Sequence, residues 1–192
     1  MEPTKVVKLK LDGGGTPEKL PKLMEPGEKE PLELYRMTRY SGKDVEAAGE
    51  FYDLIWAKTE GWELSNEKIQ KTLTRLEKGC GHEPDFRQKA GVFISALLNR
   101  AENNDLRLES KIPLDFLGFR FGKTVLVVYG DTGEYTAAQV EHATIQVNGN
   151  VGKYAGDGMQ NGMLDVKGKF EEPWGGISVG VTVKEGGRYL NP

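Results

Sequence analysis

The sequence has few of the residues that make disulfides and metal sites. It has one cysteine, Cys80, in 192 residues, so no internal disulfide can form and a reducing, cytoplasmic location is expected. Cys80 and His82 are a candidate metal pair, but a zinc site needs about four ligands. The remaining histidine is His142. We therefore expect no metal and no cofactor, and we interpret Cys80 as a partly buried thiol near a helix end.

Long apolar runs and excess basic charge are also absent. No run approaches the roughly 20 apolar residues needed to cross a bilayer, and the first 30 residues lack an apolar core of signal-peptide length. The formal net charge is −3 and the pI is about 5.6, which gives no electrostatic attraction to nucleic acid. We expect neither a membrane nor a nucleic acid among the partners.

The sequence divides into three parts. Residues 1–40 are predicted to form an extended arm, rich in proline, with a short strand at 5–11 where apolar residues alternate with lysine. Residues 41–104 are predicted to hold three helices: 44–59, 66–78 after the N-cap Ser65, and a third from Pro84 to about 103–104. Residues 32–40 are compatible with either a short strand or a turn of helix.

An internal repeat governs the third part, residues 105–192. The segment from Gly130 to Tyr135 recurs as Gly149 to Tyr154, and the offset between these two copies is the period of the repeat. Each copy follows an alternating apolar run, and a degenerate third copy follows at 163–168. A constant period of this length indicates one unit stacked on itself, because one unit alone cannot bury its apolar face. The dipeptide Asn148-Gly149 leaves a β-hairpin open as an alternative.

Stacked units predict how the side chains align. We expect Val127, Val147 and Val166 to form one inward ladder, and Tyr135 and Tyr154 to stack at a corner. Glycines are expected at the corners because glycine reaches positive φ without a Cβ clash.

These residues resemble a known family. The pattern Gly149-Asn150-x-Gly152-x-Tyr154-x-Gly156-x-Gly158-Met159-x-x-Gly162 closely resembles the GXGXG repeat. That repeat occurs in the C-terminal domain of the glutamate synthase large subunit and in the C subunit of formylmethanofuran dehydrogenase. The resemblance covers about residues 106–190 and implies a right-handed parallel β-helix, so the fold class expected is α+β. Residues 136–142 and 170–174 depart from the repeat.

Two candidate chemistries are weaker than structural interpretations of the same residues. Gly122-Lys123-Thr124 is similar to the end of a P-loop, but a glycine is missing and a strand follows instead of a helix. The acidic pairs Asp157 with Asp165 and Glu171 with Glu172 are open to a glycosidase-like role, yet a solvated acidic corner accounts for them.

The resemblance implies a structural or assembly role, because the β-helix of glutamate synthase holds other domains in register. We therefore predict a non-catalytic subunit or spacer whose partner is another protein or a second copy. The candidate interface residues are Trp174, Phe170, Tyr135 and Tyr154, since large aromatics at an irregular surface often anchor partners. The alternative is a small subunit of a redox or amidotransferase-type enzyme that contributes to a ligand or cofactor site.

Overall fold

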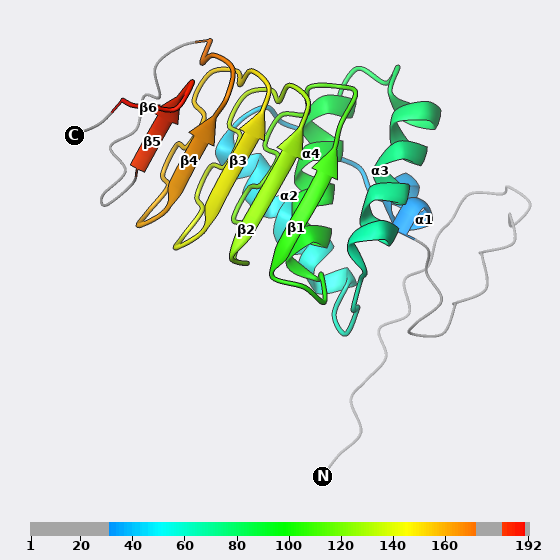
Figure 1. Ribbon diagram of the computed structural model, residues 1–192. Coiled ribbons are helices and arrows are strands. Elements are labelled where there is room, and N and C mark those ends of the chain that lie inside the picture. The colour runs from blue at the N-terminus through cyan, green and yellow to red at the C-terminus, as the bar shows by residue number, and fades with distance from the viewer. Residues whose placement is uncertain (1–30, 172–181, 191–192) are drawn as a thin grey trace, which may run out of the picture.

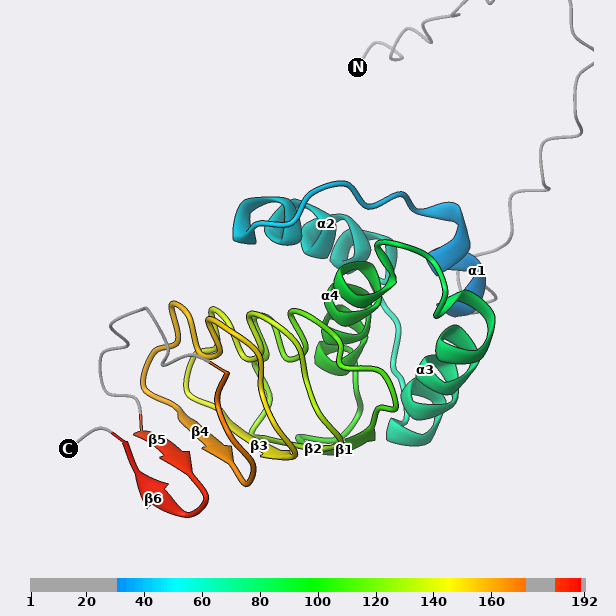
Figure 2. The same ribbon diagram turned by 90° about the horizontal axis from the view of Figure 1, so that it is seen from above.

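The structure, a computed structural model, describes residues 31–171 and 182–190. The strand expected at 5–11 and the candidate interface residue Trp174 lie outside the described residues. Within them, a group of helices is followed by a coil of parallel strands (Figure 1, Figure 2). The expected α+β fold with a short parallel β-helix is confirmed: the coil has about four turns and is right-handed (Figure 1).

Four helices precede the coil: α1 (Pro31–Met37), α2 (Val45–Lys58), α3 (Asn66–Cys80) and α4 (Phe86–Asn99). The N-cap expected at Ser65 is present, because its hydroxyl accepts the Lys68 N–H at 3.2 Å. Helix α1 lies in the range that we assigned to the arm. It is held there by Tyr35, which is buried and meets the ring of Phe93 edge-on at 5.3 Å.

Helix α4 is the centre of the helical part and lies between α2, α3 and the first turn of the coil (Figure 2). It ends at Asn99 and not at 103–104 as expected. The reason is a short parallel bridge, in which the Leu64 N–H donates to Arg100 O and the Glu102 N–H donates to Leu64 O, both at 3.0 Å. These backbone groups are therefore unavailable to a longer helix.

The coil places five strands side by side in chain order, each parallel to the last: β1 (Asp105–Glu109), β2 (Val125–Tyr129), β3 (Thr144–Asn148), β4 (Met163–Val166) and β5 (Thr182–Glu185). A two-residue strand, β6 (Arg188–Tyr189), then pairs antiparallel with β5. Since β3 and β4 are parallel, Asn148-Gly149 forms no hairpin.

The inward ladder differs by one residue from the one we expected. Val127 is paired with Gln146, is half-buried and faces outward. Its neighbour Val128 is fully buried and stands in register with Val147 and Val166. One repeat period back from Val147 leads to position 128, and side chains alternate between faces along a strand, so a one-residue error places the side chain on the wrong face.

The corners keep the backbone geometry of the repeat even where its glycines are missing. Glycines at 118, 156 and 158 have φ of 79°, 77° and 65°. In the second turn the corresponding residues are Ala137 and Gln139, and they still adopt φ of 60° and 55°. The left-handed conformation costs an L-residue about 1–2 kcal/mol, so the stacking of neighbouring turns imposes it.

The helices close the first end of the coil with side chains in place of a strand. Gln70 of α3 accepts the Glu109 N–H at 2.7 Å and donates to Glu109 O at 2.9 Å, as a neighbouring strand would. On α4, the Ser95 hydroxyl accepts the Gly118 N–H at 2.8 Å and the Asn99 amide accepts the Gly122 N–H at 2.8 Å. The open edge that a first strand presents is thereby satisfied.

The far end of the coil is closed by charge and by a hairpin. The inward row of Val128, Val147 and Val166 continues to Glu185, whose carboxylate accepts the Phe170 N–H at 3.0 Å. The chain then reverses at Gly186-Gly187, both with positive φ, into β6. An inward carboxylate and a short antiparallel edge are features that prevent further strands from adding.

Candidate functional site

Three aromatic rings stack along one corner of the coil, each one repeat period after the last. The ring centroids of Phe116 and Tyr135 are 4.8 Å apart with planes at 3°, and those of Tyr135 and Tyr154 are 4.9 Å apart with planes at 21°. The predicted stack of Tyr135 on Tyr154 is thus confirmed. Exposure increases along the stack: Phe116 is buried, Tyr135 is half-buried, and Tyr154 is 41% exposed.

All three stacked residues are held in the left-handed conformation, with φ of 59°, 56° and 58° for Phe116, Tyr135 and Tyr154. Complete burial of the Phe116 ring offsets the cost there. At Tyr154 the ring itself contributes less, because an aromatic pair contributes about 0.5–1.5 kcal/mol against a cost of about 1–2 kcal/mol for the backbone, so the stacking of neighbouring turns has to impose the conformation there as it does at the other corners. An exposed tyrosine kept in a strained conformation is therefore a candidate functional residue.

Acidic residues act on Tyr135, the middle ring of the stack. Burial raises the pKa of the Tyr135 hydroxyl, and the Tyr154 hydroxyl and the charges of Asp157, Glu134 and Asp44 raise it further. Asp157 belongs to the same tight turn as Tyr154, since its N–H donates to Tyr154 O at 3.1 Å. Asp44 comes from the other part of the fold, where its carboxylate caps α2 by accepting the Ala47 N–H at 2.8 Å. The charges near Tyr135 therefore come from both parts of the fold.

A hollow of about 620 Å³, which we call the corner groove, is lined in part by residues that closely precede the stacked tyrosines in the chain. Phe170, another candidate interface residue, is half-buried on its lining and pairs with Val151 of the previous turn. The lining has two basic residues, Arg87 and Lys169, and three acidic residues, Asp131, Glu134 and Glu171. The full lining is Arg87, Pro113, Asp131, Thr132, Gly133, Glu134, Asn150, Val151, Gly152, Lys169, Phe170 and Glu171.

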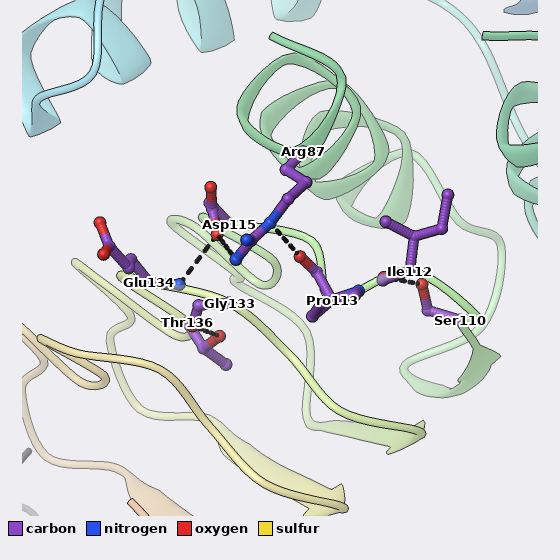
Figure 3. Close-up of polar contacts among 8 residues, drawn as sticks. All are labelled: Arg87, Ser110, Ile112, Pro113, Asp115, Gly133, Glu134 and Thr136. Atoms are coloured by element: carbon purple, nitrogen blue, oxygen red, sulfur yellow. Dashed lines mark hydrogen bonds and ion pairs between the residues drawn. The ribbon is translucent and has the colours of Figure 1, made fainter. Parts of the chain in front are cut away.

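One end of the corner groove is a buried joint between α4 and the coil (Figure 3). Arg87 reaches from α4 to the carboxylate of Asp115 at 2.6 Å and donates to Pro113 O at 2.8 Å. The same carboxylate oxygen accepts the Glu134 N–H of the next turn at 3.0 Å. Gly133 permits this approach, because a Cβ there would collide with the Asp115 carboxylate.

Burial raises the pKa of Asp115, although Arg87 and the Glu134 N–H favour its charged form. A buried carboxylate with a raised pKa beside a hollow is a common sign of a functional site. Here its hydrogen-bond partners join α4 to the first two turns, so Asp115 is a structural joint that supports the site.

The structure thus brings two of the four predicted interface residues into contact with each other, and a third lines the corner groove. Tyr135 and Tyr154 stack, Phe170 lines the adjacent groove, and Trp174 lies outside the described residues. Sequence reasoning missed Phe116, which stands one period before Tyr135 and could have been found by extending the repeat. It also missed Arg87 and Asp115, which are 28 positions apart and share no local pattern.

The remaining candidates keep structural interpretations. The Gly122 N–H donates to Asn99 and the chain leads from there into β2, so the P-loop-like segment does not precede a helix. Cys80 is buried. Asp165 lies on β4 and pairs with Lys167 at 2.7 Å. Over residues 31–171 and 182–190, no group of three or more His, Cys, Asp or Glu side chains is arranged to hold a metal ion.

Comparison of the chain with protein-family models, curated proteins and solved structures gave no significant match. The resemblance to the GXGXG family therefore stays a prediction. None of the helices in the described part of the chain is both long and apolar enough to cross a membrane.

Proposed function

We propose that the protein is a non-catalytic assembly or spacer subunit that binds a partner protein, or a second copy of itself, through the corner carrying the aromatic stack. The observation that carries the proposal is Tyr154: its ring is exposed although its backbone is strained. Interfaces are centred on a few large aromatic or arginine anchors with a polar rim. Phe170 and the mixed charges of the corner groove fit that composition.

The closed ends of the coil support a lateral site. Gln70 satisfies the first edge strand and Glu185 closes the last inward row. Neither end therefore offers a long row of free backbone groups for another strand to join. The side of the coil, where Tyr154 stands, is therefore a more suitable surface than its ends for recognising a partner.

A photocrosslinking amino acid at position 154 tests the proposal in the native cell. Replacement of Tyr154 by p-benzoylphenylalanine keeps an aromatic ring in place, and the same replacement at Tyr129 is the matched control because Tyr129 is 44% exposed but lies on the sheet. We expect one predominant protein adduct, or an adduct of two copies, from position 154 and not from 129. Adducts of equal pattern from both positions, or none from either, would refute the proposal.

A further inference from the structure

Helix α3 carries a row of basic side chains on the face turned away from its buried residues. The helix lies at the outer edge of the helical part, next to α1 (Figure 2). Its basic residues are three or four positions apart, so they share one face of the helix. We call this row the basic face, and all of its members are exposed: Lys68, Lys71, Arg75 and Lys78.

The charge of the basic face is not balanced within the described part of the chain. Three of its members, Lys68, Lys71 and Lys78, form no ion pair with a described residue, while Arg75 has an interaction partner. The carboxylate of Glu77 is engaged on the side of α3 that faces the coil, where it accepts the Lys111 N–H at 2.7 Å. Like charges at this spacing repel one another on a helix, so an acidic segment along this face would stabilise it.

A hollow of about 250 Å³ joins the basic face to the first described residue, Pro31. Three of the side chains that line it are basic and one is acidic. The full lining is Pro31, Ser65, Glu67, Lys68, Lys71, Thr72 and Arg75. The chain that precedes Pro31 therefore begins at the edge of the basic face.

The residues that precede Pro31 have the complementary charge. Residues 25–30 read Glu-Pro-Gly-Glu-Lys-Glu, with three glutamates and one lysine. Six residues span up to about 20 Å when extended, and the distance along a helix from position 68 to position 78 is about 15 Å. The segment is therefore long enough to lie along the whole basic face.

We infer that residues 25–30 bind along the basic face of α3 and thereby hold α1 against the other helices. Helix α1 has seven residues, and isolated helices of that length are not stable in water. Tyr35 anchors its middle, and ion pairs made directly before Pro31 would fix its start. This contact is electrostatic, and it is independent of the corner that carries the aromatic stack.

A spin label next to the acidic segment tests the contact in the full chain. Met24→Cys provides the attachment site, and wild type is the labelling control because its single cysteine, Cys80, is buried. The label weakens the NMR signals of backbone amides close to it. We expect weakened signals at Arg75 and Lys78 in about 10 mM salt and their recovery in about 1 M salt, because salt at that concentration screens exposed charges.

Charge reversal separates binding from the nearness that the covalent connection alone produces. Reversing the three lysines of the basic face should lower the bound population about tenfold; the substitutions are Lys68→Glu, Lys71→Glu and Lys78→Glu. The matched control changes the net charge equally at exposed lysines elsewhere and should leave the signals of α3 weakened; its substitutions are Lys43→Glu, Lys58→Glu and Lys169→Glu. Unchanged amide signals in α4 show that each variant is folded.

Exchange of the charges gives the final arm of the test. Glu25→Lys with Glu28→Lys, added to the reversed basic face, should restore the weakened signals at positions 75 and 78. Equal signals in the reversed and control variants, weakening that persists in about 1 M salt, or failure of the exchanged charges to restore it would overturn the inference.

Discussion

Replacing Asp115 tests how strongly the joint between α4 and the coil stabilises the fold. Asp115→Ala removes the acceptor for Arg87 and leaves the Glu134 N–H without its partner, which costs about 1–3 kcal/mol. Breaking a fully buried ion pair costs about 3–5 kcal/mol, but the Arg87 side chain is 47% exposed and keeps Pro113 O as acceptor. We therefore expect the free energy of unfolding to fall by about 2 kcal/mol.

Asp115→Asn is the matched control, because it keeps an oxygen for both donors and removes only the charge. We expect this variant to lose less than about 1 kcal/mol. The measurement is equilibrium unfolding in urea, followed by tryptophan fluorescence and by circular dichroism. Equal losses in the two variants would refute the role assigned to the hydrogen bond from Glu134.

A comparison of wild type with Asp115→Asn also tests how stability depends on pH. Because burial raises the pKa of Asp115 in the folded state, the folded protein binds this proton more tightly than the unfolded chain does. The stability that protonation contributes is full below the unfolded pKa of 3.8 and is lost as the pH rises through the folded pKa. Wild type should therefore gain stability relative to Asp115→Asn on acidification from about pH 7 to about pH 4. A relative loss would show that Arg87 outweighs burial.

Three further predictions concern single positions. His142 is exposed with φ of 57°, so His142→Gly should stabilise by about 0.5–1 kcal/mol relative to His142→Ala; the opposite order in thermal unfolding would contradict the strain. A Cβ at Gly152 would lie 2.7 Å from the carbonyl carbon of Gly133, so Gly152→Ala should lower the free energy of unfolding by about 1–3 kcal/mol. At Gly79 a Cβ meets nothing within 4 Å, so Gly79→Ala should be neutral or stabilising. Equal effects of the two substitutions would refute close stacking of the turns. Cys80 is only 4% exposed and burial raises the pKa of its thiol, so a thiol reagent should label it only as fast as the protein unfolds. Labelling at the rate of a free thiol would show that this helix end opens.

The coil could be predicted from the sequence because each turn depends on a short local pattern of residues that recurs along the chain. Each turn needs inward aliphatic residues and sharp corners, and both recur once per period, which also placed Tyr135 on Tyr154 correctly. The exact strand register was less secure. Strand β2 is apolar on both faces, so its composition does not distinguish Val127 from Val128, and only the period does.

The helices α2 to α4 themselves were predicted, but the contacts by which they close the coil could not be, because those contacts join residues far apart in the chain. Gln70 binds the backbone of Glu109, 39 positions away, and nothing near Gln70 distinguishes it from an ordinary polar residue on a helix surface. The joint of Arg87 with Asp115 has the same character. Side chains that replace a missing strand become visible only once the edge they cover has been placed.

The closed ends of the coil also determine how this chain could change its length. The hydrogen bonds that close the two ends are made to the first and last turns, while the inner strands pair with equivalent strands on either side. Deleting or duplicating one repeat unit would therefore move the C-terminal hairpin relative to the helices by one strand spacing, about 4.8 Å, and leave both closures intact. The distance between the helices and the C-terminal hairpin can therefore be changed in steps of one repeat, without designing a new core.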